Sequence, residues 1–162
     1  MPLRLREHAD ALLAAVAAEL PLDPAARASL ALDEHNECFL TLQDRIVVMF
    51  YLDEAAHALM LNLPIGSLPS DGGREAVMLE LLSGNYVWQL TEGGTLGIDR
   101  ATDVITLGYL VPLPLAHPEQ MPRIVEKLAS VADHWMRLLA ERAPGAPAAA
   151  PAGAPVSQGF RV

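Results

Sequence analysis

Three short apolar runs between Ser29 and Gly66 constrain the fold of this chain most. They cover residues 37–42, 46–52 and 58–63, and only short polar breaks containing "QDR" and "DEAAH" separate them. Runs of this length that are rich in Val, Ile, Phe, Tyr and Thr are typical of β-strands. Breaks this short favour antiparallel connections. We therefore predict an antiparallel meander of three strands.

The middle run is apolar on both faces. Side chains of a strand alternate between the two faces of a sheet. The run therefore divides into two sets, Ile46, Val48, Phe50 and Leu52 on one face and Val47, Met49 and Tyr51 on the other. A sheet with one face in water would alternate apolar and polar residues. We expect the protein's own helices to cover one face and something else to cover the other.

Helical patterns lie before, between and after the predicted strands. Residues 3–20 and 118–142 have apolar side chains at helical spacing, and residues 69–88 form a further helical stretch. A hairpin follows the second helix, with strands in 95–99 and 103–113 around the turn "RAT". The order is helix, meander, helix, hairpin, helix. It predicts an α+β fold with a twisted antiparallel sheet of about five to six strands and three helices.

The length of 162 residues favours a single domain, which we place at residues 1–142. Residues 143–162 are rich in Ala, Pro and Gly. Such a composition buries too little apolar surface to fold, so we predict a disordered tail.

The charge of the chain excludes some classes of partner. Acidic residues number 20 and basic residues 11, which gives a net charge of −9. The tail carries one charge, Arg161 (+1), so the remainder carries −10. An acidic body repels nucleic acid and anionic membrane surfaces. No run approaches the roughly 18 apolar residues of a membrane span, so we expect a cytoplasmic protein with no membrane insertion.

Three glycines, Gly93, Gly94 and Gly97, raise the possibility of a phosphate-binding loop. A dinucleotide-binding loop runs from a strand into a helix, so that the helix N-terminus faces the phosphates. Here the order is helix, loop, strand, and no Lys-Ser/Thr pair follows. We favour a turn that leads into a strand, with Gly97 allowing close backbone approach.

No catalytic constellation is visible in the sequence. The five histidines lack metal-ligand spacing, and Cys38 shares a strand face with Leu40 and Leu42, which favours a buried structural thiol. We therefore predict no enzymatic activity, no cofactor and no metal.

Two segments resemble the Tir-chaperone (CesT-type) family, the class I chaperones of type III secretion. Asp33–Leu42 matches the family's "DE-x-x-x-C-x-L-x-L" stretch. The second match is a helix that ends in an "LL-x-x-N" stretch before a glycine-rich hairpin strand. It comprises Leu81, Leu82, Asn85, Gly93, Gly94, Leu96, Gly97 and Asp99. The resemblance extends over about residues 3–142 in the order of elements.

The resemblance implies a homodimer that binds the N-terminal segment of one or more secreted effectors in extended form. It implies that the bound effector stays soluble and ready for secretion. The secretion ATPase is a further candidate partner that the resemblance implies. Two alternatives remain open. One is a regulatory or scaffold module that binds peptides on a similar sheet, and the other is a small ligand-binding enzyme with a polar pocket.

Two sets of apolar residues are candidates for these contacts. For the effector we select residues on the first helix and on the strand faces away from the expected core: Leu5, Leu12, Leu40, Leu42, Val47, Met49, Tyr51, Met60 and Leu96. The second helix is apolar over a wide arc and must be covered on two sides. Its dimer candidates, with the residues just after it, are Val77, Met78, Leu81, Leu82, Tyr86 and Trp88.

Overall fold

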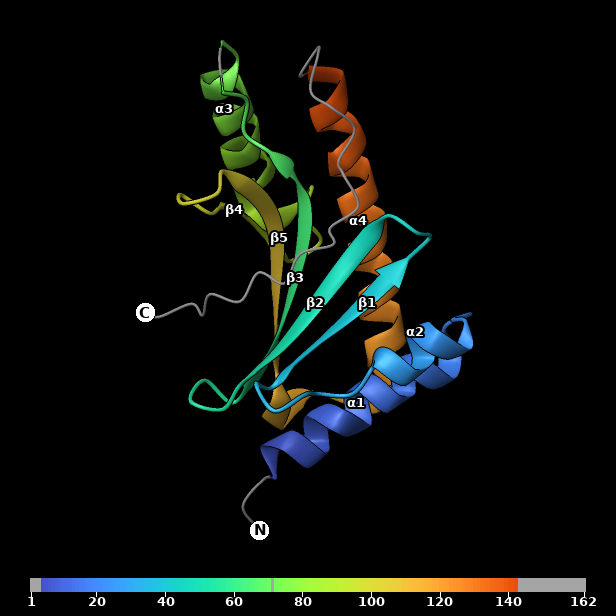
Figure 1. Ribbon diagram of the computed structural model, residues 1–162. Coiled ribbons are helices and arrows are strands. Elements are labelled where there is room, and N and C mark those ends of the chain that lie inside the picture. Colours follow the sequence, from blue (N-terminus) through green and yellow to red (C-terminus); the bar gives the residue numbers. More distant parts are fainter. Residues whose placement is uncertain (1–3, 71, 143–162) are drawn as a thin grey trace.

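The computed structural model describes residues 4–70 and 72–142 (Figure 1). The helices are α1 (Leu5–Glu19), α2 (Pro24–Ser29), α3 (Arg74–Gly84) and α4 (Met121–Arg142). The strands are β1 (Glu37–Leu42), β2 (Ile46–Asp53), β3 (Ala58–Ser67), β4 (Thr95–Ile98) and β5 (Val104–Pro112). Short 3₁₀ turns are η1 (Tyr86–Trp88), η2 (Leu113–Leu115) and η3 (Pro118–Gln120). The predicted α+β order is confirmed.

All five strands form one antiparallel sheet in the order β1-β2-β3-β5-β4. The meander and the later hairpin are therefore parts of one sheet, joined where β3 pairs with β5. β3 extends to Ser67, four residues beyond the predicted 58–63, because β5 continues to pair with it past a register shift between Pro64 and Gly66. A bulge of this kind lets a strand carry a proline without ending the ladder.

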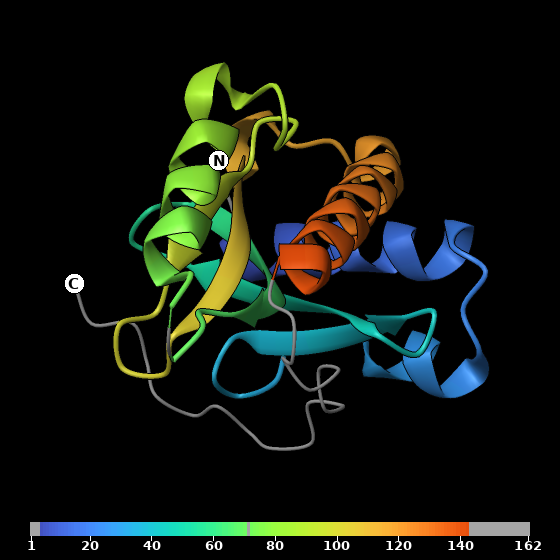
Figure 2. The ribbon, with the colours of Figure 1, turned by 90° about the horizontal axis from the view of Figure 1, so that it is seen from above.

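Helices cover one face of this sheet. α4 packs on β2 and β3, and α1 packs against α4. Viewed from above, both helices lie on the same side of the sheet (Figure 2). The core between these layers holds the largest fully buried side chains, among them Phe50 and Trp135. The face of β2 with Ile46, Val48 and Phe50 is the core face. The alternation predicted that these residues share a face.

The helices differ from the sequence expectations at their ends. α2 is absent from the elements predicted above, because its six residues have no buried face. Proline at its start and the Asp23 carboxylate, which accepts a hydrogen bond from the Ala26 N–H at 2.8 Å, define it instead. The predicted helix over 69–88 is shorter and ends at Gly84. Val87 and Trp88 have φ angles of 56° and 54°, a left-handed conformation that no α-helix continues through.

Some sequence expectations fall on residues that are not described. The predicted tail, 143–162, and the first three residues lie outside the described residues. Within residues 4–70 and 72–142, no helix is long and apolar enough to cross a membrane.

Candidate partner-binding surface

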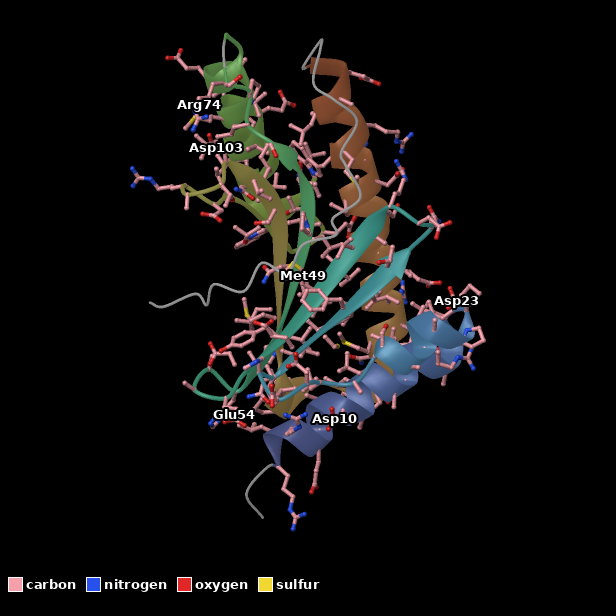
Figure 3. All side chains as sticks on the ribbon, viewed as in Figure 1. Asp10, Asp23, Met49, Glu54, Arg74 and Asp103 are labelled. Carbon is pink, nitrogen blue, oxygen red and sulfur yellow. The ribbon has the colours of Figure 1, made fainter. Side chains whose placement is uncertain are left out.

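The second face of the sheet carries a continuous apolar surface. Strand register brings its side chains into rows, because residues directly opposite on antiparallel strands are neighbours on the same face. Tyr51 pairs with Met60, and Met60 pairs with Leu110. Phe39 pairs with Met49 in the next row. Val47 completes a surface of six residues that we call the open face: Phe39, Val47, Met49, Tyr51, Met60 and Leu110. Met49 is labelled on the sheet in Figure 3.

The open face is accessible to a partner. Phe39, Tyr51 and Leu110 are 44%, 39% and 48% exposed. Met49 and Met60 are half-buried between them. A core-facing strand residue such as Phe50 is 1% exposed. Polar residues such as Glu37, Thr41 and Asn62 also lie on this face, opposite Tyr51, Val47 and Met49 in the register. A partner would therefore bury the apolar side chains of the open face beside polar ones.

The predicted effector-contact residues divide between the open face and the core. Val47, Met49, Tyr51 and Met60 lie on the open face. Leu5 and Leu42 are half-buried against the core cluster. The other three predictions are wrong, since these side chains are at most 6% exposed and form the core: Leu12, Leu40 and Leu96.

The errors have a common physical reason. Leu12 lies on the stripe of α1 that packs against α4, and Leu40 shares the core face of β1 with Cys38. A strand that is apolar on both faces does not show from sequence alone which face is inside. The sequence selection also missed Phe39 and Leu110. The alternation in β1 and β5 was the signal. Phe39 lies between the buried Cys38 and Leu40, and Leu110 lies between the half-buried Tyr109 and the buried Val111.

A second apolar surface lies on α3 and the chain after it. Seven of its residues are 41–77% exposed, and we call them the α3 surface: Met78, Leu79, Leu82, Tyr86, Val87, Trp88 and Leu90. Four of the six predicted dimer residues are among them. The other two, Val77 and Leu81, are each 3% exposed and face the protein's own core. They are corrected to core residues.

Close packing fixes the α3 surface to the body. Gly84 lies against the buried indole of Trp135, where a Cβ atom would come within 2.3 Å of the ring. The Trp135 Nε1–H donates a hydrogen bond to the Leu90 carbonyl at 3.0 Å. The Asn85 amide donates to the Leu96 carbonyl at 3.0 Å and accepts from the Leu96 N–H at 2.8 Å. These two hydrogen bonds between Asn85 and Leu96 attach the end of α3 to β4.

The other end of α3 is held by an ion pair. The Arg74 guanidinium makes two hydrogen bonds to the Asp103 carboxylate, at 2.6 and 3.0 Å (Figure 3). This pair holds the pKa of Asp103 below its usual value. Bidentate geometry of this kind fixes orientation as well as distance. α3 is therefore attached to the β4–β5 hairpin at both ends.

The glycine-rich loop packs against β5. A Cβ on Gly94 would meet the Leu107 side chain at 2.7 Å and the Gly108 carbonyl at 3.2 Å, and Gly93 has a φ of 91°. These two glycines serve a tight turn and a close approach to the sheet. Gly97 does not, because its nearest contact would be 3.9 Å away. The expectation of close approach at Gly97 is corrected to Gly94.

The described residues include no cluster of three or more His, Cys, Asp or Glu that could hold a metal ion. The Cys38 thiol is buried, which raises its pKa to about 12, so it stays protonated and unreactive. An apolar cavity of about 170 Å³ lies beside β5 and the start of α4. A wider cavity of about 490 Å³ lies between the α1–α2 link, the β1–β2 turn and α4.

The fold and these two surfaces define a small α+β protein with two exposed apolar surfaces. The model of the Tir chaperone protein (CesT) family matches residues 12–136. The chain belongs to this family.

Solved structures of similar fold include several complexes. The chain matches a structure titled "Crystal Structure of the ExsC-ExsE Complex" with a TM-score of 0.65 and 22% identity, over 83% of this chain and 96% of the other. A match to the HopA1–SchA chaperone–effector complex has a TM-score of 0.64 and 19% identity, over 82% and 95%. A match to the ExoU–SpcU complex of the type III secretion system of Pseudomonas aeruginosa has a TM-score of 0.55 and 19% identity, over 70% and 92%. No curated protein matches the chain by sequence.

Proposed function

We propose that the protein is a cytoplasmic type III secretion chaperone of a bacterium. It binds the N-terminal chaperone-binding segment of an effector in extended form and keeps it soluble and ready for secretion. The observation that carries this proposal is the open face, an apolar sheet surface that the protein's own helices leave exposed. Membership of a chaperone family supports the same function.

An extended segment fits the open face better than a folded domain does. The rows Tyr51–Met60–Leu110 and Phe39–Met49 run across the strands and are half exposed rather than protruding. Such a surface takes alternate side chains of an extended peptide. Met49 and Met60 have flexible, polarisable side chains that adapt to different residues of a partner. The surface therefore suits segments that share apolar spacing rather than one sequence.

Co-purification with candidate effectors tests this function. Each candidate is expressed without a tag beside the tagged full-length protein, once intact and once without its N-terminal segment. We expect one or more intact candidates to co-purify and the shortened forms to be lost. Retention of the shortened forms would contradict the proposal and would favour the alternative of a regulatory or scaffold module that binds other parts of its partners.

The enzyme alternative receives no support from the described residues. Ser130 and Asp133 both line the wider cavity, but the Asp133 carboxylate forms ion pairs with Arg45 and Arg137. Cys38 is buried with a raised pKa. We propose a protein without enzymatic activity that acts by binding alone.

We further propose that the protein is a homodimer that pairs through the α3 surface. Leu79, Leu82, Tyr86 and Trp88 are 58–77% exposed on one short helix and the turn after it. Monomeric proteins rarely expose so contiguous an apolar patch. A second copy supplies an identical apolar surface, which a two-fold axis would bring face to face.

A Leu82→Asp substitution should weaken the dimer. Leu82 is 68% exposed, so the change leaves the protomer core intact while it places a charge in an apolar interface. We expect the dissociation constant of the dimer to rise by about tenfold, which corresponds to the loss of a contact worth over 1 kcal/mol. Sedimentation velocity over a dilution series measures this.

The matched control is Leu115→Asp, because Leu115 is 74% exposed on η2 and lies outside the α3 surface. This variant should remain a dimer. Equal dissociation of the two variants, or a wild-type protein that is monomeric at micromolar concentration, would exclude this interface.

A further inference from the structure

The edge of β5 is only partly paired. β4 pairs with β5 from Ile105 to Gly108, whereas β3 pairs with it through to Pro112. Within the described residues, Tyr109–Pro112 therefore has a strand neighbour on one side only. An unpaired strand edge exposes N–H and C=O groups that can pair with another extended segment.

An apolar cavity lies along this unpaired edge. Its volume is about 170 Å³, and it touches all four residues of Tyr109–Pro112. Since successive side chains point to opposite faces, a cavity that touches four consecutive residues lies against the strand's edge. Leu115, Met121 and Ile124 form its apolar walls. An apolar cavity of about 150 Å³ is large enough for a benzene ring. The site thus offers a strand edge beside a space that fits a phenyl group.

We propose that residues 156–162 of the same chain, with the sequence VSQGFRV, occupy this site. They would add to the edge of β5 as a short strand and place Phe160 in the cavity. The chain after Arg142 has only three branched or aromatic residues, Val156, Phe160 and Val162, and all three fall in this segment. Phe160 and Val162 are two residues apart, so they share a face in an extended strand. The segment has no proline, while Arg161 brings a positive charge to a body of net charge −10.

The length of the intervening chain fits this placement. The cavity lies at the first residue of α4, and the tail leaves from its last residue. A helix of 22 residues is about 33 Å long at 1.5 Å per residue. Residues 143–155 are rich in Pro and Ala, and 13 residues of extended polyproline-type chain span about 40 Å. A spacer of this length would therefore be long enough to span α4.

This contact would protect the fold from pairing through that edge with other chains. Natural proteins commonly cover a free strand edge with another part of the chain. The proposal does not rest on the proposed chaperone function, since it involves residues of this chain alone, although Leu110 belongs both to the cavity lining and to the open face. Under this proposal, the expectation of a disordered tail applies to residues 143–155, which form the spacer, and not to residues 156–162, which bind.

A nitroxide spin label on the tail tests the proposal in the full-length protein. The label is attached through Ala154→Cys, and Cys38 stays unlabelled because it is buried with a pKa of about 12. We expect the label to attenuate the amide NMR signals of Tyr109–Ala116. A Phe160→Asp substitution should restore these signals, whereas Ser157→Asp, which adds the same charge on the opposite face of the segment, should restore them less.

Three outcomes would overturn the proposal. The first is attenuation that is unchanged by Phe160→Asp. The second is attenuation centred on Met49 and Met60, which would place the tail on the open face. The third is attenuation in a mixture in which the nitroxide and the isotope label are on different chains, which would mean that a second copy supplies the segment. Leu115→Asp gives an independent check, because it alters the cavity wall without touching the tail and should also restore the signals.

Discussion

A Met49→Asp protein should fold normally and bind the effector segment much more weakly than the wild type does. Met49 is half-buried at the centre of the open face, between Phe39 and Asn62 in the register. A carboxylate at this position would be desolvated by a bound apolar segment, and its neighbours in the register, Phe39 and Asn62, carry no positive charge. Central apolar contacts of an interface typically contribute 2 kcal/mol or more. We expect affinity to fall by about 30-fold or more, measured by calorimetry with an effector that co-purifies with the wild-type protein.

Two further variants make this result interpretable. Ala14→Asp adds the same charge at an exposed position of α1 and should bind as the wild type does. Leu40→Asp places the charge in the core, where the side chain is fully buried, and should prevent folding. If Met49→Asp unfolds as Leu40→Asp does, Met49 belongs to the core. If it folds and binds with unchanged affinity, the effector surface lies elsewhere.

A Gly84→Ala substitution should destabilise the protein by about 2 kcal/mol. The new methyl group would lie 2.3 and 2.5 Å from two ring carbons of Trp135 and 3.0 Å from a Leu96 methyl. Trp135 is 1% exposed and hydrogen-bonded to Leu90, so its ring has little freedom to move. Overpacking of this kind costs about 3 kcal/mol, which the better helix propensity of alanine offsets by about 1 kcal/mol.

Gly72→Ala is the matched control, because a Cβ atom there meets nothing within 4 Å. Its free energy of unfolding should stay close to that of the wild type, and urea titrations at one protein concentration measure both variants. Equal stability of the two variants would show that Trp135 does not pack on Gly84 as described.

The alternation of side chains was enough to predict the sheet and to divide β2 into two faces. The two sets lie on opposite faces as predicted, and the structure shows that Val48 and Phe50 are inside and Met49 and Tyr51 outside. In β1 the alternation placed Cys38 on one face with Leu40 and Leu42, but Phe39 on the opposite face was not selected, and neither was Leu110 of β5.

Features that depend on distant contacts could not be predicted in the same way. The wide apolar arc of α3 predicted cover on two sides, but it did not show that Val77 and Leu81 face the protein's own core. That division follows from the contact of Gly84 with Trp135, which is 51 residues further along the chain. The left-handed conformation of Val87 likewise has no local sequence signal, since β-branched residues rarely adopt it.

The central claim is that an effector segment lies on the open face, and methyl NMR of the methionines tests it most directly. Met49 and Met60 lie on the open face, Met78 lies on the α3 surface, and Met121 is 1% exposed in the core. The full-length protein carries isotope-labelled methionine methyl groups and is titrated with the N-terminal segment of an effector that co-purifies with it. We expect large shifts of the Met49 and Met60 methyl signals and little change at Met78 and Met121. Saturable binding that leaves the Met49 and Met60 signals unchanged would contradict the claim.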